Sequence, residues 1–188
     1  QIQLIENGTP KAMQNNLPAT QLVWNLGIRI LHWTLAVSMI AAFATHESGS
    51  VWHEYIGYVA LAAASIRIVL GFTANGYWRF SQFFRGISTT VQYAKDVVHK
   101  REKRYLGHNP LGGWMVVLLL ADTMAAGLTG WLFTTDAFWG MEWLEELHEF
   151  FGTLIMPLLI LHLAGVIFTS IRHRENLAAA MVHGRKKL

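Results

Sequence analysis

The stretch HEFFGTLIMPLLILH, residues 148–162, is an apolar run with a histidine at each end. In an α-helix this fourteen-residue spacing corresponds to a rise of about 21 Å, and fourteen steps of about 100° end about 40° short of four full turns. If the run crosses a membrane, His148 and His162 lie near its opposite surfaces and on nearly the same helix face. A histidine inside a membrane span is costly and usually has a partner, so we expect each of them to face another side chain.

Composition places the chain in a membrane. Of its 188 residues 53% are hydrophobic and 14% are charged. A spanning helix needs about 20 apolar residues, and four runs reach that length: 23–45, 52–72, 111–133 and 147–171. The fold class predicted is therefore all-α, an integral membrane four-helix bundle with short amphipathic surface helices. Its parts are a tail at 1–22, the bundle at 23–171 and a second tail at 172–188.

The positive charges predict the topology. No Lys or Arg lies between His32 and Arg67, or between Arg104 and Arg172. Because Lys and Arg next to spans stay on the cytoplasmic side, the first-to-second and third-to-fourth connections face outward. Both termini and the loop 73–109, where we expect amphipathic surface helix, are cytoplasmic. The inner side carries Lys11, Lys100, Arg101, Lys103, Arg104, Arg172, Arg174, Arg185, Lys186 and Lys187.

Two classes of partner and cofactor are excluded by these counts. The net charge of +3 comes from residues that flank spans, so it indicates anionic lipid and no nucleic acid. The chain has no cysteine, which excludes disulfides, cysteine-ligated iron–sulfur clusters and haem attached through C-x-x-C-H. The first twenty residues lack the order of a cleavable signal. The first span is expected to be the insertion signal, and a chain that begins at Gln1 is expected to be trimmed.

Topology supplies a facing histidine for each end of the fourth span. His53 enters the second span from outside, level with His148, in the stretch HEYIGY that resembles HEFFGT. Neither stretch is a zinc-protease HExxH, because a glycine replaces the second histidine. His32 lies near the inner end of the first span, level with His162. Two histidines at equal depth on facing helices suit a bis-imidazole haem, so the sequence predicts two haems, one above the other.

Neighbouring residues fit this hypothesis. Gly57 and Gly152 follow His53 and His148 by four residues and Gly165 follows His162 by three, so they share the histidine face and leave room for a porphyrin ring. Helix glycines also serve close packing, and that alternative stays open.

Two arginines are expected at the membrane depth of the inner pair. Arg67 lies fourteen residues after His53, and Arg29 lies one turn before His32, so both could reach the carboxylates of the inner haem. A plain positive-inside role is the alternative for Arg67.

Two other polar residues have structural interpretations. His108, at the inner mouth of the third span, is expected to cap the surface there, with ligation or quinone contact as the alternative. Asn109 is expected to cap the helix that begins at Pro110. Asp122, in the middle of the third span, is expected to be a hydrogen-bonded packing residue, with proton transfer as the alternative.

These residues resemble a known family, the four-helix di-haem cytochromes b. The family includes bacterial cytochrome b561, the b-type cytochrome subunit of nickel-iron hydrogenases and, more distantly, the membrane subunit of respiratory formate dehydrogenase. The matching elements are RILHW (29–33), His53 with Arg67, YLGHNPLGGW (105–114), His148 with His162, and MVHG (181–184).

The resemblance implies two non-covalent haems b, ligated by His53 with His148 and by His32 with His162. It also implies electron exchange between quinone or quinol and a redox partner in the bacterial inner membrane. We therefore expect an electron-transfer protein that serves a periplasmic cytochrome c or an oxidoreductase subunit. The acidic residues Glu47, Glu54, Asp136, Glu142, Glu145 and Glu146 would suit docking there.

Three alternatives remain open at this point. The chain could anchor a nickel-iron hydrogenase or a similar dehydrogenase. It could act alone as a quinol oxidoreductase that passes electrons to oxygen or superoxide. Outside redox chemistry, it could be a histidine-lined metal or proton transporter.

Overall fold

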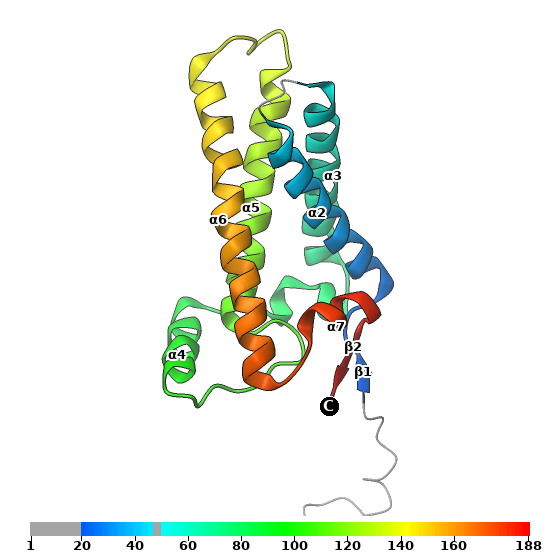
Figure 1. Ribbon diagram of the computed structural model, residues 1–188, viewed down its shortest axis with the longest axis vertical. Coiled ribbons are helices and arrows are strands. Elements are labelled where there is room, and N and C mark those ends of the chain that lie inside the picture. Colours follow the sequence, from blue (N-terminus) through cyan, green and yellow to red (C-terminus); the bar gives the residue numbers. More distant parts are fainter. Residues whose placement is uncertain (1–19, 47–49) are drawn as a thin grey trace, which may run out of the picture.

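The computed structural model describes residues 20–46 and 50–188. Four helices in it are long and apolar enough to cross a membrane: α2 (Leu26–Ala44), α3 (Val51–Thr73), α5 (Pro110–Phe133) and α6 (Glu142–His173). They form an upright bundle (Figure 1). The predicted all-α membrane fold is confirmed. The main difference in bounds is that α6 begins at Glu142, because residues 142–146 continue the helix beyond the apolar run.

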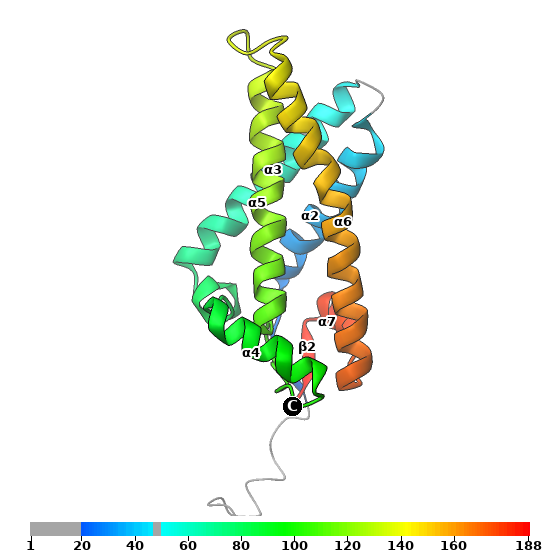
Figure 2. The same cartoon turned by 90° about the vertical axis from the view of Figure 1, so that its left-hand side faces the viewer.

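The helices pack unequally around the bundle. Helix α5 lies along both α3 and α6, and α2 lies along α3. In contrast, α6 comes close to α2 at only a few positions and to α3 at still fewer. The turned view shows α6 crossing in front of α2 (Figure 2). Side chains, more than backbone contact, therefore bridge α6 to α2 and α3.

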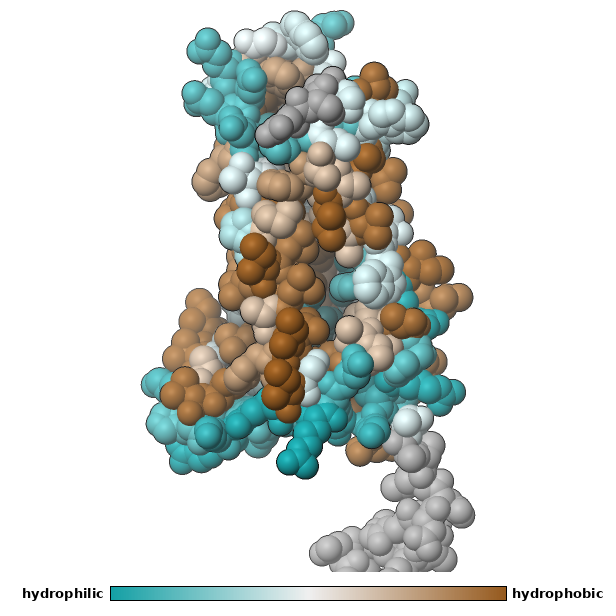
Figure 3. Space-filling model, in the orientation of Figure 1, coloured by the Kyte–Doolittle hydropathy of each residue, from teal (hydrophilic) through white to brown (hydrophobic). Residues whose placement is uncertain are grey.

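The surface of the bundle carries an apolar band between two polar ends (Figure 3). Large apolar side chains such as Val37, Ile66, Ile160 and Phe168 are more than half exposed, as expected where lipid is the solvent. We call one end the acidic end; its described residues are 45–46, 50 and 134–141 with the adjoining helix termini. The opposite, basic end holds residues 20–25, 74–109 and 174–188. Lys11 and Glu47 lie outside the described residues.

Asparagine side chains cap the N-termini of two of the spanning helices. Asn25 Oδ1 accepts a hydrogen bond from the Ile28 amide at 3.0 Å, and Asn109 Oδ1 accepts one from the Gly112 amide at 2.7 Å. Both satisfy amides that lack a partner in the first turn of a helix. The predicted cap at Asn109, followed by Pro110 as the first helical residue, is confirmed.

Between α3 and α5 the chain forms less helix than expected. Two short 3-10 turns, η2 (Gly76–Trp78) and η3 (Phe80–Gln82), precede α4 (Ile87–Val98), and residues 101–109 are not helical. The ion pair of Glu102 with Arg172 fastens this last part to the end of α6, with Nε 2.5 Å from the carboxylate oxygen. Its basic side chains therefore face water while Glu102 holds the loop to the bundle.

The two ends of the described chain are joined to each other, although the sequence predicts two separate tails. Strand β1 (Thr20–Leu22) pairs antiparallel with β2 (Arg185–Lys187). The amides of Val23 and Trp24 both donate to the Gly184 carbonyl, at 2.9 and 3.0 Å. Helix α7 (Leu177–His183) packs Ala180 against Val23, Trp24 and Ile28. We call β1, β2, α7 and Gly184 the clasp.

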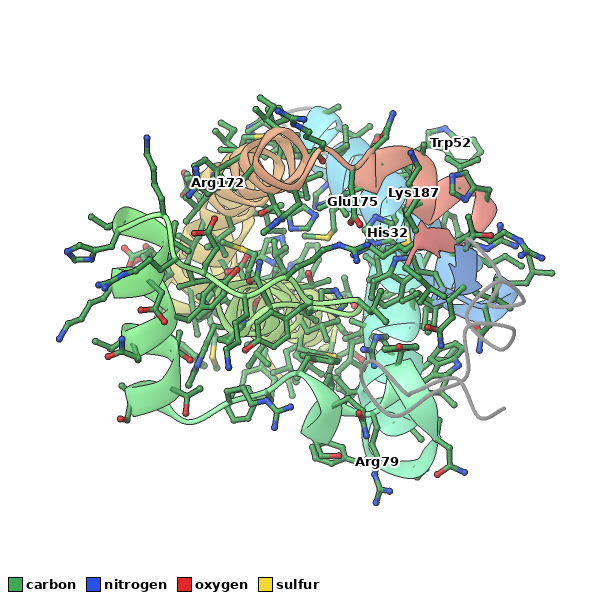
Figure 4. All side chains as sticks on the ribbon, turned by 90° about the horizontal axis from the view of Figure 1, so that it is seen from below. His32, Trp52, Arg79, Arg172, Glu175 and Lys187 are labelled. Atoms are coloured by element: carbon green, nitrogen blue, oxygen red, sulfur yellow. The ribbon has the colours of Figure 1, made fainter. Side chains whose placement is uncertain are left out.

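Charged residues reinforce the clasp from the loop that follows α4. Glu175 pairs with Arg104 and lies 3.7 Å from Lys186 Nζ, while Arg104 also donates to the Lys187 carbonyl. Figure 4 views this network from the basic end, with Arg172, Glu175 and Lys187 labelled. Because Lys186 is buried, its charge needs Glu175 as a partner.

Replacing Gly184 with alanine should loosen the clasp. Gly184 has φ of +81°, and an added Cβ would lie 2.3 Å from the Trp24 carbonyl oxygen. A left-handed conformation alone costs a residue with a side chain about 1 to 3 kcal/mol. We expect Gly184→Ala to lower the thermal unfolding temperature of the detergent-solubilised protein. Gly86→Ala is the control, because φ is −59° there and nothing lies near the added carbon. Equal unfolding temperatures for the two variants would contradict the role of the clasp.

The Glu102–Arg172 pair should make stability depend on pH. The hydrogen bond from Arg172 lowers the pKa of Glu102 from 4.5 to about 2. A carboxyl whose pKa is lowered by folding stabilises the fold above its unfolded pKa, and that contribution disappears as pH falls toward the folded pKa. We expect wild type to be more stable than Glu102→Gln near neutral pH and the difference to vanish between pH 4.5 and about 2. A difference that does not change with pH would contradict this role.

Candidate functional site

Helix α6 supplies one histidine to each of two cross-helix pairs. His148 meets His53 of α3 near the acidic end, with ring centroids 6.0 Å apart. His162 meets His32 of α2 nearer the basic end, with ring centroids 6.4 Å apart. The structure thus brings together the residues that the sequence pairs by depth. We call them the acidic-end pair and the basic-end pair.

The separations suit one metal ion between the rings of each pair. A metal–imidazole bond is about 2 Å long, and a ring nitrogen lies about 1.2 Å from the ring centre, given ring bonds of about 1.35 Å. Two bonds and two such radii in line give about 6.4 Å between centroids. Aromatic rings in edge-to-face contact also have centroids about 4.5 to 7 Å apart, so the separations agree with a metal ion held between the rings but do not by themselves require one.

Backbone carbonyls orient the rings of the acidic-end pair. His53 Nδ1 lies 2.9 Å from the Ala42 carbonyl oxygen, and His148 Nδ1 lies 2.9 Å from that of Ala126. A carbonyl accepts only, so Nδ1 carries the proton in each ring and Nε2 keeps its lone pair. This is the usual outer contact of a ligating histidine, and it fixes both the tautomer and the ring orientation. The Thr129 hydroxyl, 3.3 Å from His148 Nδ1, adds a second contact.

Open space surrounds the three glycines that the sequence associates with the histidines. No heavy atom lies within 4 Å of the Cβ position of Gly57, Gly152 or Gly165. Other helix glycines in the bundle differ, because a Cβ at Gly127 would lie 2.9 Å from that of Leu61. Close packing therefore does not explain the first three. Gly57 and Gly152 are half-buried and share a helix face with a histidine, so the open space there agrees with a flat cofactor, whereas Gly165 is exposed.

Nothing else in the described residues forms a metal centre. Across 20–46 and 50–188 no three His, Asp or Glu side chains gather in a group that could hold a metal ion. The four histidines of the two pairs are grouped in twos. This suits a porphyrin, because the porphyrin itself supplies the other four ligands of the iron.

Gly130 and Thr129 are site residues that the sequence analysis did not identify. An added Cβ at Gly130 would lie 2.8 Å from His148 Cε1, so this glycine makes room for the imidazole of the facing helix. A glycine in an apolar span is a common packing signal, and the sequence alone does not separate it from Gly127.

The two arginines lie at the basic end and bind backbone there. Arg67 is 9% exposed, donates to the Trp78 carbonyl at 3.0 Å and lies 5.0 Å from the centre of the Phe80 ring. Arg29 donates to the Val182 carbonyl of α7, while its Nε is buried without a partner. That free donor could bind a carboxylate. The contact of either arginine with a haem carboxylate stays a prediction.

His108 does not cap the surface as expected. Its ring lies 4.9 Å from that of Trp24 and 4.8 Å from that of Phe83, between centroids. Burial, helped by the charge of Arg67, lowers the pKa of His108 to about 3, so the ring is neutral. Its Nδ1 has no hydrogen-bond partner. The expectation was wrong because Asn109 alone caps the helix, and the aromatic residues of two other segments enclose the histidine.

One comparison with known proteins identifies a family. The family model of prokaryotic cytochrome b561 matches residues 23–184. No curated protein and no solved structure matches the chain. The resemblance that the sequence suggests is thereby confirmed.

Replacing Gly130 with alanine should disturb the acidic-end pair alone. Overpacking of a buried site costs about 1 to 3 kcal/mol, equivalent to about 5-fold to about 150-fold in an equilibrium constant, and here the imidazole of His148 must move. We expect the Gly130→Ala protein to lose cofactor from that pair about tenfold more readily on dilution, by absorbance. Gly127→Ala is the control. Gly127 lies on the same helix as Gly130, but its added Cβ would collide with Leu61 of α3 and with no histidine. Equal loss from both variants would show a general packing effect.

Proposed function

Because the chain belongs to the prokaryotic cytochrome b561 family, we propose that it relays electrons across the bacterial membrane between quinol and a partner at its acidic end. Membership makes the chain a multi-pass membrane cytochrome that binds b-type haem and transfers electrons. The proposal adds the number of haems, their ligands and the two redox partners.

The observation that carries the proposal is the presence of two histidine pairs, 6.0 and 6.4 Å between ring centroids, joined by one helix. We assign one haem b to His53 and His148 and a second to His32 and His162. A haem b held in this way supplies reversible one-electron chemistry, with a potential set by its ligands and surroundings.

The surrounding residues orient the ligands and leave room for the cofactor. The carbonyls of Ala42 and Ala126 hold the acidic-end imidazoles in the tautomer that leaves Nε2 free. Gly57, Gly152 and Gly165 leave the space that a ring needs. Arg29 and Arg67 lie at the end where they could neutralise the carboxylates of the basic-end haem. Each of these residues acts by positioning and none reacts.

The charge of the two ends supports an orientation and a kind of partner. With the basic end in the cytoplasm, the exposed acidic side chains face the periplasm: Glu54, Asp136, Glu142, Glu145 and Glu146. The described residues of this end include no Lys or Arg. Such a surface favours association with a basic partner, such as a soluble cytochrome c or a basic subunit of an oxidoreductase.

Haem stoichiometry of histidine variants tests the ligand assignment. We expect wild type to contain two haems, His53→Ala to lose the acidic-end haem, and His162→Ala to lose the basic-end haem. The measurement is the reduced-minus-oxidised spectrum with a pyridine haemochrome count. His99→Ala is the control, since this exposed histidine bonds only the Lys95 carbonyl, and it should keep both haems. Absence of Soret and alpha bands in wild type would refute the proposal, and loss of the same haem in both variants would refute the pairing.

A further inference from the structure

Asp122 is a buried carboxyl group without a partner. It lies in α5, is 5% exposed, and neither carboxylate oxygen has a hydrogen-bond partner. The expectation of a hydrogen-bonded packing residue was therefore wrong. A buried polar group usually has a partner, and each exception needs an explanation. A membrane-buried acidic residue is by default a functional candidate.

The position of Asp122 places it inside the bundle between the two histidine levels. It shares one helix face with Ala126 and Thr129, four and seven residues on, and both of these contact His148. Asp122 lies about 6 Å from Ala126 along the axis, toward the basic end. Next to it along this face, Ala126 packs with Met39 of α2 and Ile155 of α6 in an apolar cluster. Both carboxylate oxygens are therefore buried, and an apolar cluster lies one helical turn away.

No charged neighbour accounts for the presence of a buried carboxyl group at this position. Asp122 is the only charged residue of α5. The histidine and arginine side chains that are partly or fully buried on the other spans are Arg29 and His32 on α2, His53 and Arg67 on α3, and His148, His162, Arg172 and His173 on α6. Within the described residues none of them forms an ion pair or a hydrogen bond with Asp122. Arg67 instead binds the Trp78 carbonyl.

We infer that Asp122 is a proton-binding site coupled to electron transfer, whose carboxylate takes up one proton when a neighbouring haem is reduced by one electron. The inference rests on the proposed function, in which quinol supplies the electron. A ferric haem carries one more positive charge than a ferrous haem, so reduction removes charge that stabilises a carboxylate nearby. Asp122 lies about 6 Å along α5 from Ala126, whose carbonyl contacts His148, and charges in the low-dielectric interior interact more strongly at a given distance than they do in water. One proton added to a carboxylate oxygen balances the electron, and both leave on reoxidation.

Redox titration at a series of pH values tests the inference. For a one-electron couple a tenfold change in proton activity shifts the potential by at most about 59 mV. We expect the wild-type haem potentials to fall as pH rises, and we expect a smaller slope in Asp122→Asn. Asp96→Asn is the matched control, because this carboxyl lies on α4 and accepts from Gln92, and it should keep the wild-type slope. An unchanged slope in Asp122→Asn would overturn the inference.

Infrared difference spectra between reduced and oxidised protein give a second readout. We expect reduction of wild type to produce a protonated-carboxyl band that disappears in Asp122→Asn and shifts in Asp122→Glu, while Asp96→Asn retains it. If Asp122→Asn fails to bind haem, the comparison of wild type with Asp122→Glu decides, and an unshifted band overturns the inference. A protein without haem bands would refute the proposed function itself. Haem bands with identical carboxyl signals in every variant would refute only the role of Asp122.

Discussion

The fourteen-residue spacing of His148 and His162 on one helix is the constraint to which the other helices conform. An imidazole in hydrocarbon needs a partner, and one helix offers two of them about 21 Å apart on nearly one face. The partners must then come from helices that present a histidine at each level. Helix α3 does so at His53 and α2 does so at His32. Since these two helices pack on each other, a single face of α6 can serve both pairs.

This arrangement divides the bundle into a packed half and an open half. Helix α5 fills the packed half, where Gly127 and Gly130 allow Leu61 and His148 to approach its backbone closely. On the histidine faces of α3 and α6, an added Cβ at Gly57, Gly152 or Gly165 would have no neighbour within 4 Å, and the backbones of α2 and α6 stay apart. The same residue type thus has two opposite uses, close contact in one half and clearance in the other. The packed half holds the His148 ring through Ala126 and Thr129, while the His53 ring is held by the Ala42 carbonyl of α2.

The sequence predicts well the features that depend on one helix or on membrane depth. The four spans, the cap at Asn109 and the fold class follow from apolar length and local hydrogen bonding, which need no knowledge of neighbours. Prediction from the sequence fails where the surroundings of a residue are formed by segments that are distant in the chain. Gly130 is distinguished from Gly127 only by the side chain that faces it, and His108 is buried by Trp24 and Phe83 from other parts of the chain. The strands β1 and β2 are three residues each, too short for an alternating pattern to be read. For Asp122 the sequence predicts a hydrogen-bond partner, and neither of its carboxylate oxygens has one.

The clasp is part of the site because it fixes the helix that carries His32. Arg29 donates to the Val182 carbonyl and Trp33 Nε1 lies 3.4 Å from the Met181 carbonyl, so bonds to α7 lie on both sides of His32 in the sequence. The family match extends from 23 to 184, and it begins and ends at a hydrogen-bonded pair, the Val23 amide with the Gly184 carbonyl. The match therefore covers α7 and Gly184, while the strands β1 and β2 lie just outside it. The acidic-end pair has its rings held by carbonyls within the spans, whereas the basic-end pair depends on the helix position that this closure sets.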